Sequence, residues 1–406
     1  MKRAIPRLVF IVILVQTLIW SSVSANALAQ CTSYDRLIQI ELELFPYSSI
    51  YENTSMAGSD YYKRSLENVS KYPLNSYKLL INAYRTILIY ELDNQMELIG
   101  NKSAADSFLD DAQSDLSNIT QEMDEHTPKT FASLEWRELA KREIQIATEY
   151  LNQSKNYYNK TDYNSTIFYL ISADSSIHKA RGYFYLAMEK DKADITIDNT
   201  SNFSDISGYV SLKWIDIVGK TIDFFESIGY EEYLLFPKHA INQSKNYHSV
   251  GLYYDALMNA AYAKASIEYY TREHLAQTDT SQILALCELY LNYADVIMSR
   301  VYNDPDVDAP FAESTIEQAK LHLHDAEEQS GTNVVAIAEL SIQESLIARE
   351  QALASLDLKK AIHLGLNDIE ISEETSQTDT IGVQYTMLLI IIVETVILIF
   401  LWVKRR

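Results

Sequence analysis

The chain has 406 residues, of which only 10 are glycine and 7 are proline. Because these turn formers reach only about a third of their usual share, loop-rich sandwiches and barrels are excluded and long helices are favoured. The formal net charge of −22 excludes a general nucleic-acid-binding protein, since such a protein needs a basic face to replace the counterions on phosphates. The 47% hydrophobic content is sufficient for a buried core. Composition therefore predicts an all-α protein.

The first 29 residues are typical of a secretory signal peptide. Lys2, Arg3 and Arg7 precede an apolar core from Leu8 to Trp20, and small residues follow. The apolar core is too short for a comfortable membrane span. An uncleaved anchor is the alternative. The pattern predicts that the chain is exported.

A second apolar segment, residues 381–403, is long enough for a transmembrane helix. Its 23 residues would span about 35 Å as a helix. The basic residues 404–406 follow at once, and positive residues stay on the cytoplasmic side. We therefore expect a single-pass type I protein of the plasma membrane, with a cytoplasmic C-terminus and with residues 30–380 outside the cell.

Glu394 is the one charged residue of this apolar segment. It lies near the predicted centre of the bilayer, where a carboxylate is costly. One interpretation is a neutral side chain that lipid tolerates. The other is a polar contact inside the membrane, made with a second copy of the chain or with another protein's helix.

Ten Asn-x-Ser/Thr sequons occur where chance predicts roughly three. Such acceptors require an exported and exposed chain, so they predict a glycoprotein. A composition rich in Asn, Ser and Thr at helix ends is the alternative. The candidates are Asn53, Asn68, Asn101, Asn118, Asn152, Asn159, Asn164, Asn199, Asn202 and Asn242.

The clearest structural pattern predicts an antiparallel pair of helices. Small and apolar residues recur at helical spacing from Ala140 to Tyr158 and again from Tyr163 to Ala180. Asp162, in the polar turn between the two stripes, can cap the second helix. Two such helices with a short turn make a helical hairpin.

This hairpin is predicted to return 90 residues later. The letters NQSKNY at Asn152–Tyr157 recur unchanged at Asn242–Tyr247, and an alanine-rich stripe follows over Tyr253–Tyr270. We expect the turn between the two helices around Gly251, and we expect Pro237 to interrupt the first helix of this copy.

Two weaker copies complete the predicted array. One begins at Ile316 and places Ala336, Leu340 and Ile347 on the inner face of its second helix, and the other covers Tyr77–Met123. The second helix begins with a tyrosine, and alanines follow at helical spacing. This pattern is similar to that of tetratricopeptide hairpins. Since 90 is not a multiple of their usual period of ~34, the predicted fold is an irregular array of antiparallel helical hairpins with one C-terminal transmembrane helix.

Polar, acidic and proline-containing stretches set the predicted boundaries, and Val301–Pro310 breaks the helices within the second lobe. The predicted organisation is a signal peptide (1–29), an N-terminal helical lobe (30–190), a polar inter-lobe loop (191–205), a C-terminal helical-hairpin lobe (206–366), an acidic stalk (367–380), a transmembrane helix (381–403) and a cytoplasmic tail (404–406).

The hairpins resemble the helical region that follows the protease domain in archaeal membrane-anchored Lon-like serine peptidases. The resemblance lies in YLNQSKNYYNKTDYNSTIFYLISADSSIHKA at Tyr150–Ala180, in the NQSKNYH copy and in the closing apolar segment, and it covers residues 135–403. It implies an exported, membrane-anchored chain. The glycine-rich, serine-bearing loop and the partner lysine of the protease domain are absent from this sequence. The resemblance therefore implies the accessory region without its enzyme.

No catalytic or cofactor motif is found in the sequence. Phosphate-binding glycine loops, GxSxG and HExxH are absent. His322 and His324 point about 200° apart on a helix, which favours a solvated face over a metal site. Cys287 lies in an apolar run and is predicted to be a buried free thiol, although a disulfide with Cys31 remains open. Tyrosine pairs are predicted to pack between hairpins, with a binding platform as the alternative.

We expect a non-catalytic, surface-anchored helical-repeat protein that mediates protein–protein interaction or scaffolding at the cell envelope. It would need no cofactor and no metal, and its partners would be the membrane and other envelope or membrane proteins, or a second copy through the transmembrane helix. One alternative is an accessory subunit of a membrane Lon-like protease or a secretion complex. Another is a structural, glycosylated spacer of the envelope.

Overall fold

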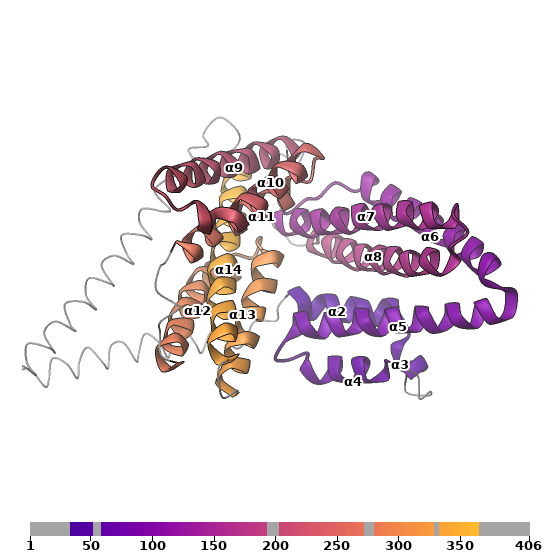
Figure 1. Ribbon diagram of the computed structural model, residues 1–406. Coiled ribbons are helices and arrows are strands. Elements are labelled where there is room, and N and C mark those ends of the chain that lie inside the picture. The colour runs from indigo at the N-terminus through magenta and orange to yellow at the C-terminus, as the bar shows by residue number, and fades with distance from the viewer. Residues whose placement is uncertain (1–32, 52–57, 193–202, 272–279, 329–332, 365–406) are drawn as a thin grey trace, which may run out of the picture. The chain divides into compact units, whose positions relative to one another are not determined.

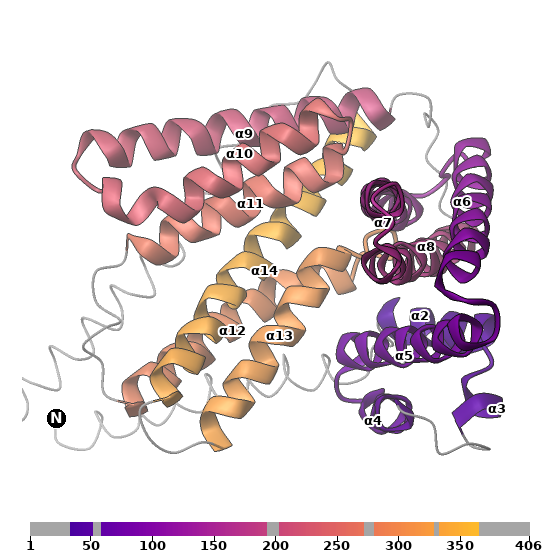
Figure 2. The same cartoon turned by 45° about the vertical axis from the view of Figure 1, so that its right-hand side comes forward.

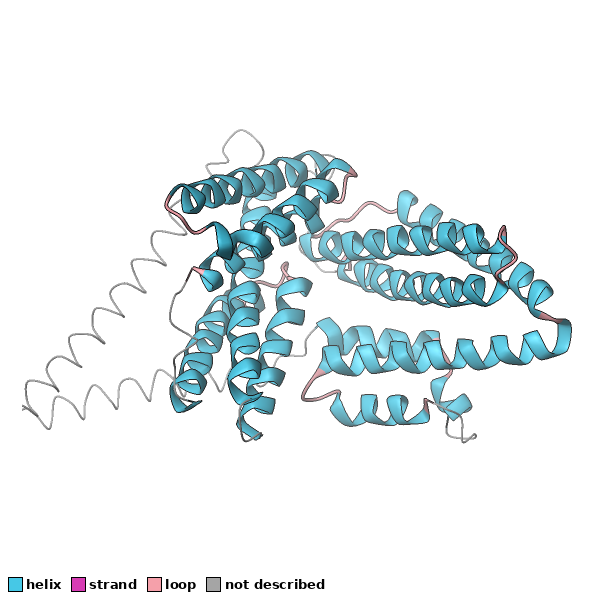
Figure 3. Ribbon diagram, viewed as in Figure 1, coloured by secondary structure: helices cyan, strands magenta, loops and turns pink. Residues whose placement is uncertain are grey.

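The computed structural model describes residues 33–51, 58–192, 203–271, 280–328 and 333–364. Within these ranges every regular element is a helix, which confirms the predicted all-α class (Figure 3). No helix there combines the length and the apolar character needed to cross a membrane. The predicted signal peptide, stalk and transmembrane segment lie outside the described residues, as do Cys31, Asn53, Asn199, Asn202 and Glu394.

The described residues up to His363 belong to one compact unit, and the boundary between the two lobes stays a prediction. The first seven helices that the structure describes are α2 (Ser33–Leu44), α3 (Tyr47–Tyr51), α4 (Ser59–Asn68), α5 (Pro73–Ile99), α6 (Asn101–Glu125), α7 (Phe131–Tyr158) and α8 (Tyr163–Lys190). After the undescribed residues 193–202 come α9 (Phe203–Ser227), the 3-10 helix η2 (Glu231–Leu234), α10 (Leu235–Ser249), α11 (Tyr253–Tyr270), α12 (Thr280–Tyr302), α13 (Pro310–Glu328) and α14 (Asn333–Leu364). Figures 1 and 2 show α6 beside α7 and α8, α4 beside α5, and α12 to α14 grouped together.

The first predicted hairpin is confirmed as α7 and α8. Asp162 caps α8, because its carboxylate accepts the backbone N–H of Ser165 at 3.1 Å. Ala147 of α7 and Leu170 of α8 are fully buried in the core that these two helices share with α6. Small residues at this face let the two helix axes approach closely.

The second hairpin, α10 and α11, is confirmed with one correction. Gly251 forms the turn at φ 81°, a left-handed conformation that glycine adopts without steric cost. Pro237 does not interrupt a helix, because it lies in the first turn of α10, where its missing N–H costs no hydrogen bond. The helix before the turn is therefore shorter than its counterpart α7.

The third copy corresponds to α13 and α14, but the predicted inner face of α14 is wrong. Ala336 and Leu340 are exposed, Leu340 by 45%, whereas Ala338 and Ile342 are buried. The third predicted residue, Ile347, is buried as expected. The thiol of Cys287 on α12 donates to the carbonyl oxygen of Ala338 at 2.9 Å, which requires a small residue there. The close approach of α12 to α14 at Ala338 thus decides which face of α14 is buried.

The predicted pair over Tyr77–Met123 also needs correction. Its two helices exist as α5 and α6, but α6 packs mainly against α8, and the hairpin partner of α5 is α4. A buried serine marks that hairpin, since the Ser65 hydroxyl donates to the carbonyl oxygen of Ser76 at 2.9 Å. Ser244 of α10 bonds in the same way to Ala256 of α11, and Ser154 of α7 is buried at the equivalent place. Ser65, Ser154 and Ser244 are spaced by about 90 residues, so the hairpin α4/α5 belongs to the same repeat as α7/α8 and α10/α11.

Candidate functional site

An open groove of about 690 Å³ lies between α6 and α7. Leu116 and the buried Leu151 supply its apolar part. The other lining residues are polar or charged: Gln113, Ser117, Thr120, Gln121, Asp124, Glu125, Thr148, Asn152 and Lys155. Binding sites for small apolar ligands are mostly lined by hydrophobic side chains, so this groove is better suited to an occupant that presents both polar and apolar groups.

The groove runs beside the buried face of α6. Ala112, Ile119 and Met123 are buried in the core shared with α7 and α8. Thr120 and Asp124, each one residue further along α6, line the groove beside this buried face. The hydroxyl of Thr130 accepts the backbone N–H of Ser133 at 3.0 Å and so fixes where α7 begins. The start of α7, one of the two helices that form the groove, is therefore fixed by a helix cap.

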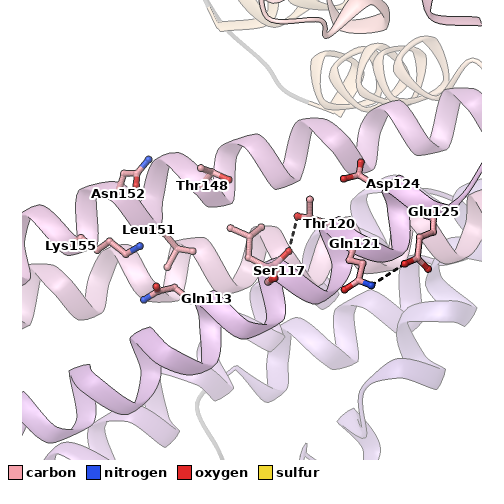
Figure 4. Close-up of a pocket in the computed structure, with 11 residues that line it drawn as sticks. Gln113, Ser117, Thr120, Gln121, Asp124, Glu125, Thr148, Leu151, Asn152 and Lys155 are labelled. Carbon is pink, nitrogen blue, oxygen red and sulfur yellow. Dashed lines mark hydrogen bonds between the residues drawn. The ribbon is translucent and has the colours of Figure 1, made fainter.

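Charges of opposite sign mark the two ends of the groove. Figure 4 shows Lys155 at one end and Asp124 with Glu125 at the other. Between them, the Thr120 hydroxyl donates to the carbonyl oxygen of Leu116 at 2.7 Å, which leaves the hydroxyl oxygen as an acceptor. The groove thus offers a row of hydrogen-bonding groups between a positive and a negative end.

A buried polar junction connects the start of α7 with the loop 303–309, with α11 and with α14. One carboxylate oxygen of Glu135 accepts the hydroxyl of Tyr254 at 2.8 Å. The other accepts the backbone N–H groups of Asp308 at 2.9 Å and Ala309 at 3.0 Å. The Tyr254 hydroxyl also lies 3.1 Å from that of Ser355. Glu135 therefore holds three separate elements together.

Two aspartates of the same loop strengthen the junction. The indole N–H of Trp136 donates to Asp308 at 2.6 Å, and Lys190 forms an ion pair with Asp308 at 2.8 Å. Asp306 accepts the backbone N–H of Phe131 at 2.9 Å, which places a carboxylate at the N-terminus of α7. The sequence DPDVDAP, whose carboxylates could be taken for a weak calcium site, uses these two carboxylates for structural contacts.

Burial raises the pKa of Glu135 to about 7, and the neighbouring Asp308 adds to the rise. Burial likewise raises the pKa of Asp255 to about 7, although Arg142 lies 3.5 Å away and opposes the shift. A carboxyl group near neutrality beside a tyrosine is common in acid–base catalysis. Glu135 and Tyr254 are nevertheless only 0% and 1% exposed, so no substrate reaches them in this conformation. We assign the junction to structure.

Seven of the predicted glycosylation residues are described, and six of their side chains are exposed. Asn68 is half-buried and donates to the carbonyl oxygen of Arg64 at 2.8 Å. Asn152 lines the groove, so a glycan at this residue would cover it. The exposed residues are Asn101, Asn118, Asn152, Asn159, Asn164 and Asn242.

The remaining predicted features are placed as follows. Cys287 is buried, as predicted, and forms no disulfide with any residue that the structure describes; a disulfide with Cys31 stays open. His322 lies 2.6 Å from Glu344 on α14, whereas His324 faces Glu328 of its own helix at 3.3 Å. Among the described residues, no group of three or more His, Cys, Asp or Glu side chains could hold a metal ion.

The tyrosine pairs pack into the core with one or both members, in accord with the predicted packing role. The second member is buried in Tyr61-Tyr62 and in Tyr253-Tyr254, and both members are half-buried in Tyr157-Tyr158 and in Tyr269-Tyr270. Tyr62 stacks on two other tyrosine rings, Tyr47 and Tyr51, both at 5.9 Å.

Sequence reasoning missed both the groove and the junction. The repeated letters NQSK drew attention to Asn152 and Lys155, but the periodicity of α7 alone gave no sign that the polar face of α6 would lie opposite them. Comparison of the chain with protein-family models, with curated proteins and with solved structures found no match.

Proposed function

We propose that the protein is a non-catalytic helical scaffold on the outer face of the plasma membrane that binds an extended segment of a partner protein in the groove between α6 and α7. The observation that carries this proposal is the groove itself, which is open, lined mostly by polar residues and bounded by Lys155 at one end and Asp124 with Glu125 at the other. An extended peptide presents backbone donors and acceptors along its length, and the opposite charges can fix its direction.

The anchoring part of the proposal rests on the sequence. The apolar segment 381–403 and the basic residues after it support a single membrane span, and the apolar core of residues 1–29 supports export. A helical-repeat frame, similar to tetratricopeptide hairpins, suits a scaffold because each hairpin is held by its neighbours. The resemblance to the accessory region of Lon-like peptidases supports a role beside such an enzyme or a secretion complex.

The test of groove binding uses a matched pair of lysines. Lys155 and Lys245 occupy the same place in the two NQSKNY copies, but only Lys155 lines the groove. A photo-activatable cross-linker at Thr148 should capture a partner in cells. Lys155→Glu should abolish that product and Lys245→Glu should leave it intact. Equal cross-linking in both variants would refute groove binding.

A second candidate function, a glycosylated envelope spacer, is favoured by the six exposed sequon asparagines. The spacer function predicts that Asn152 carries a glycan. Groove binding predicts that it does not, because a glycan there closes the groove. Peptide mass spectrometry of the protein from its own host decides between them. Full occupancy of Asn152 supports the spacer, and an unmodified Asn152 keeps the groove available.

A further inference from the structure

A cluster of exposed apolar side chains lies where α9 turns into α10, at the upper left of Figure 2. We call it the aromatic end. It consists of five exposed side chains: Phe224 (58% exposed), Ile228 (52%), Tyr233 (48%), Leu235 (70%) and Phe236 (56%). Soluble proteins seldom leave so many large apolar groups together in water, and such clusters mark interaction surfaces.

Two sets of ring contacts hold the aromatic residues of the aromatic end. Ring centroids lie 5.5 Å apart between Phe224 and Phe225, 5.7 Å between Phe225 and Tyr230, and 6.0 Å between Tyr230 and Tyr233. Phe236 stacks on the ring of Tyr270 in α11 at 5.4 Å. These contacts hold Phe224, Tyr233 and Phe236 against neighbouring rings, so the aromatic part of the surface is present before anything binds.

We propose that the aromatic end inserts into the outer leaflet of the bilayer that residues 381–403 span, an inference that rests on the membrane anchoring proposed above. Apolar side chains of this kind bury themselves at the acyl boundary, and tyrosines such as Tyr230 and Tyr233 favour the level of the head groups. The occupant is a lipid surface with uncharged head groups.

The surrounding charges support uncharged lipid. Lys238 forms an ion pair with Glu226, and Lys220 with Asp216 at 2.6 Å. The 3-10 helix η2 adds two acidic residues, Glu231 and Glu232. No excess of positive charge is therefore available for anionic head groups, and attraction comes from the apolar side chains.

Size and charge disfavour a second copy of the chain as the occupant. Five large side chains that are each about half exposed offer on the order of 500 Å², which is less than the ~800 Å² per partner of a standard protein interface. The net charge of −22 also makes two copies repel each other. A bilayer with uncharged head groups does not repel the chain. Insertion of a few side chains into it also needs no matching protein surface of standard size.

The covalent connection permits the contact. Residues 365–380 follow α14, and a fully extended chain of 16 residues spans at most about 55 Å. The end of α14 lies near the start of α7, since His363 is 3.8 Å from Asp306, which in turn accepts the N–H of Phe131. The start of α9 adjoins the same region, because Phe203 and Leu134 line one hollow. From there the 25 residues of α9 extend about 37 Å to the aromatic end, within reach of the chain.

The test uses the full-length chain reconstituted in phosphatidylcholine vesicles. A polarity-sensitive fluorophore is attached to Ile228→Cys in a Cys31→Ser background, and vesicles contain a quencher on the lipid acyl chain. The matched control is Leu98→Cys, another exposed apolar residue (82%) at the far end of α5. We expect at least threefold stronger quenching at residue 228 than at residue 98, and loss of that difference when Leu235 and Phe236 are changed to Ser.

Equal quenching at the two positions would overturn the inference. A fluorophore at residue 228 that is shielded in cells but not in pure lipid vesicles would also overturn it, because this result points to a protein partner. Extraction of the same vesicles at alkaline pH separates this failure from a failure of the anchor. A chain that leaves the vesicles refutes the proposed anchoring itself. A chain that stays, with no quenching at residue 228, refutes only the lipid contact.

Discussion

Glu135 couples the stability of the fold to pH. It accepts three hydrogen bonds, but burial outweighs them and raises its pKa from 4.5 to about 7. Between these pH values the folded chain therefore holds a proton that the unfolded chain has released. The stabilisation from this group is fully present below pH 4.5 and is lost as the pH rises through about 7. Its size is on the order of 3 kcal/mol.

Replacing Glu135 by glutamine should flatten this pH dependence. The amide oxygen can still accept the N–H groups of Asp308 and Ala309, and the amide carries no charge at any pH. Between pH 5 and pH 8, the free energy of unfolding should fall by about 2–3 kcal/mol less in Glu135→Gln than in the wild type. Denaturant titrations at both pH values measure this. The control, Glu149→Gln, changes an exposed glutamate of the same helix and should leave the slope unchanged. An unchanged slope in Glu135→Gln would contradict the assignment.

At the scale of the helical elements, regular spacing predicted the hairpins α7/α8 and α10/α11, including the cap at Asp162 and the turn at Gly251. The same method failed on α14. Apolar residues there are nearly continuous from Val334 to Ile342, so more than one face of the helix fits an apolar stripe. The contact between Cys287 and Ala338 decides which face is buried, and it lies beyond the reach of periodicity.

The buried serines give the hairpins a testable contact. The Ser244 hydroxyl donates to the carbonyl oxygen of Ala256 on the facing helix, where no room remains for a larger side chain. Ser244→Ala should lower the free energy of unfolding by about 1 kcal/mol. Ser244→Leu should cost at least about 1–3 kcal/mol, because it forces the helices apart. Thermal unfolding measures both. Ser249→Ala, at an exposed serine of the same helix, should change little. If Ser244→Leu unfolds like the wild type, close packing at this point is refuted.

At the scale of the whole molecule, the decisive contacts join residues that lie far apart in the sequence. Glu135 meets the loop at Asp308 across 173 positions, and Glu317 of α13 accepts the N–H groups of Leu74 and Asn75 at the start of α5 at 2.8 Å. Local propensity and periodicity describe neighbours along the chain, so they predict helices and hairpins but not which hairpin faces which. The groove between α6 and α7 could not be predicted for the same reason, because it depends on how these two helices pack in space.

The junction predicts a large cost for losing Asp308. Asp308→Ala leaves the indole N–H of Trp136 and the ammonium group of Lys190 without their carboxylate. We expect a loss of about 1–3 kcal/mol in the free energy of unfolding and earlier protease cleavage within the loop 303–309. Asp216→Ala serves as the control, because it removes an exposed i,i+4 ion pair worth only about 0.3–0.5 kcal/mol. Equal destabilisation by both changes would show that the junction does not hold the fold.

The position of α14 also decides how the molecule would carry mechanical load. If residues 381–403 are the anchor, tension from the membrane enters at Leu364, the end of a helix of 32 residues. Lys359 pairs with Asp304, so the pull passes first to the loop 303–309 and from there, through Asp306, to α7. The force acts along α14 and shears it past its neighbours, while the hairpin α4/α5 lies outside this path. The first contacts to bear such a load would thus be the polar ones that join α14 to the loop 303–309 and this loop to α7.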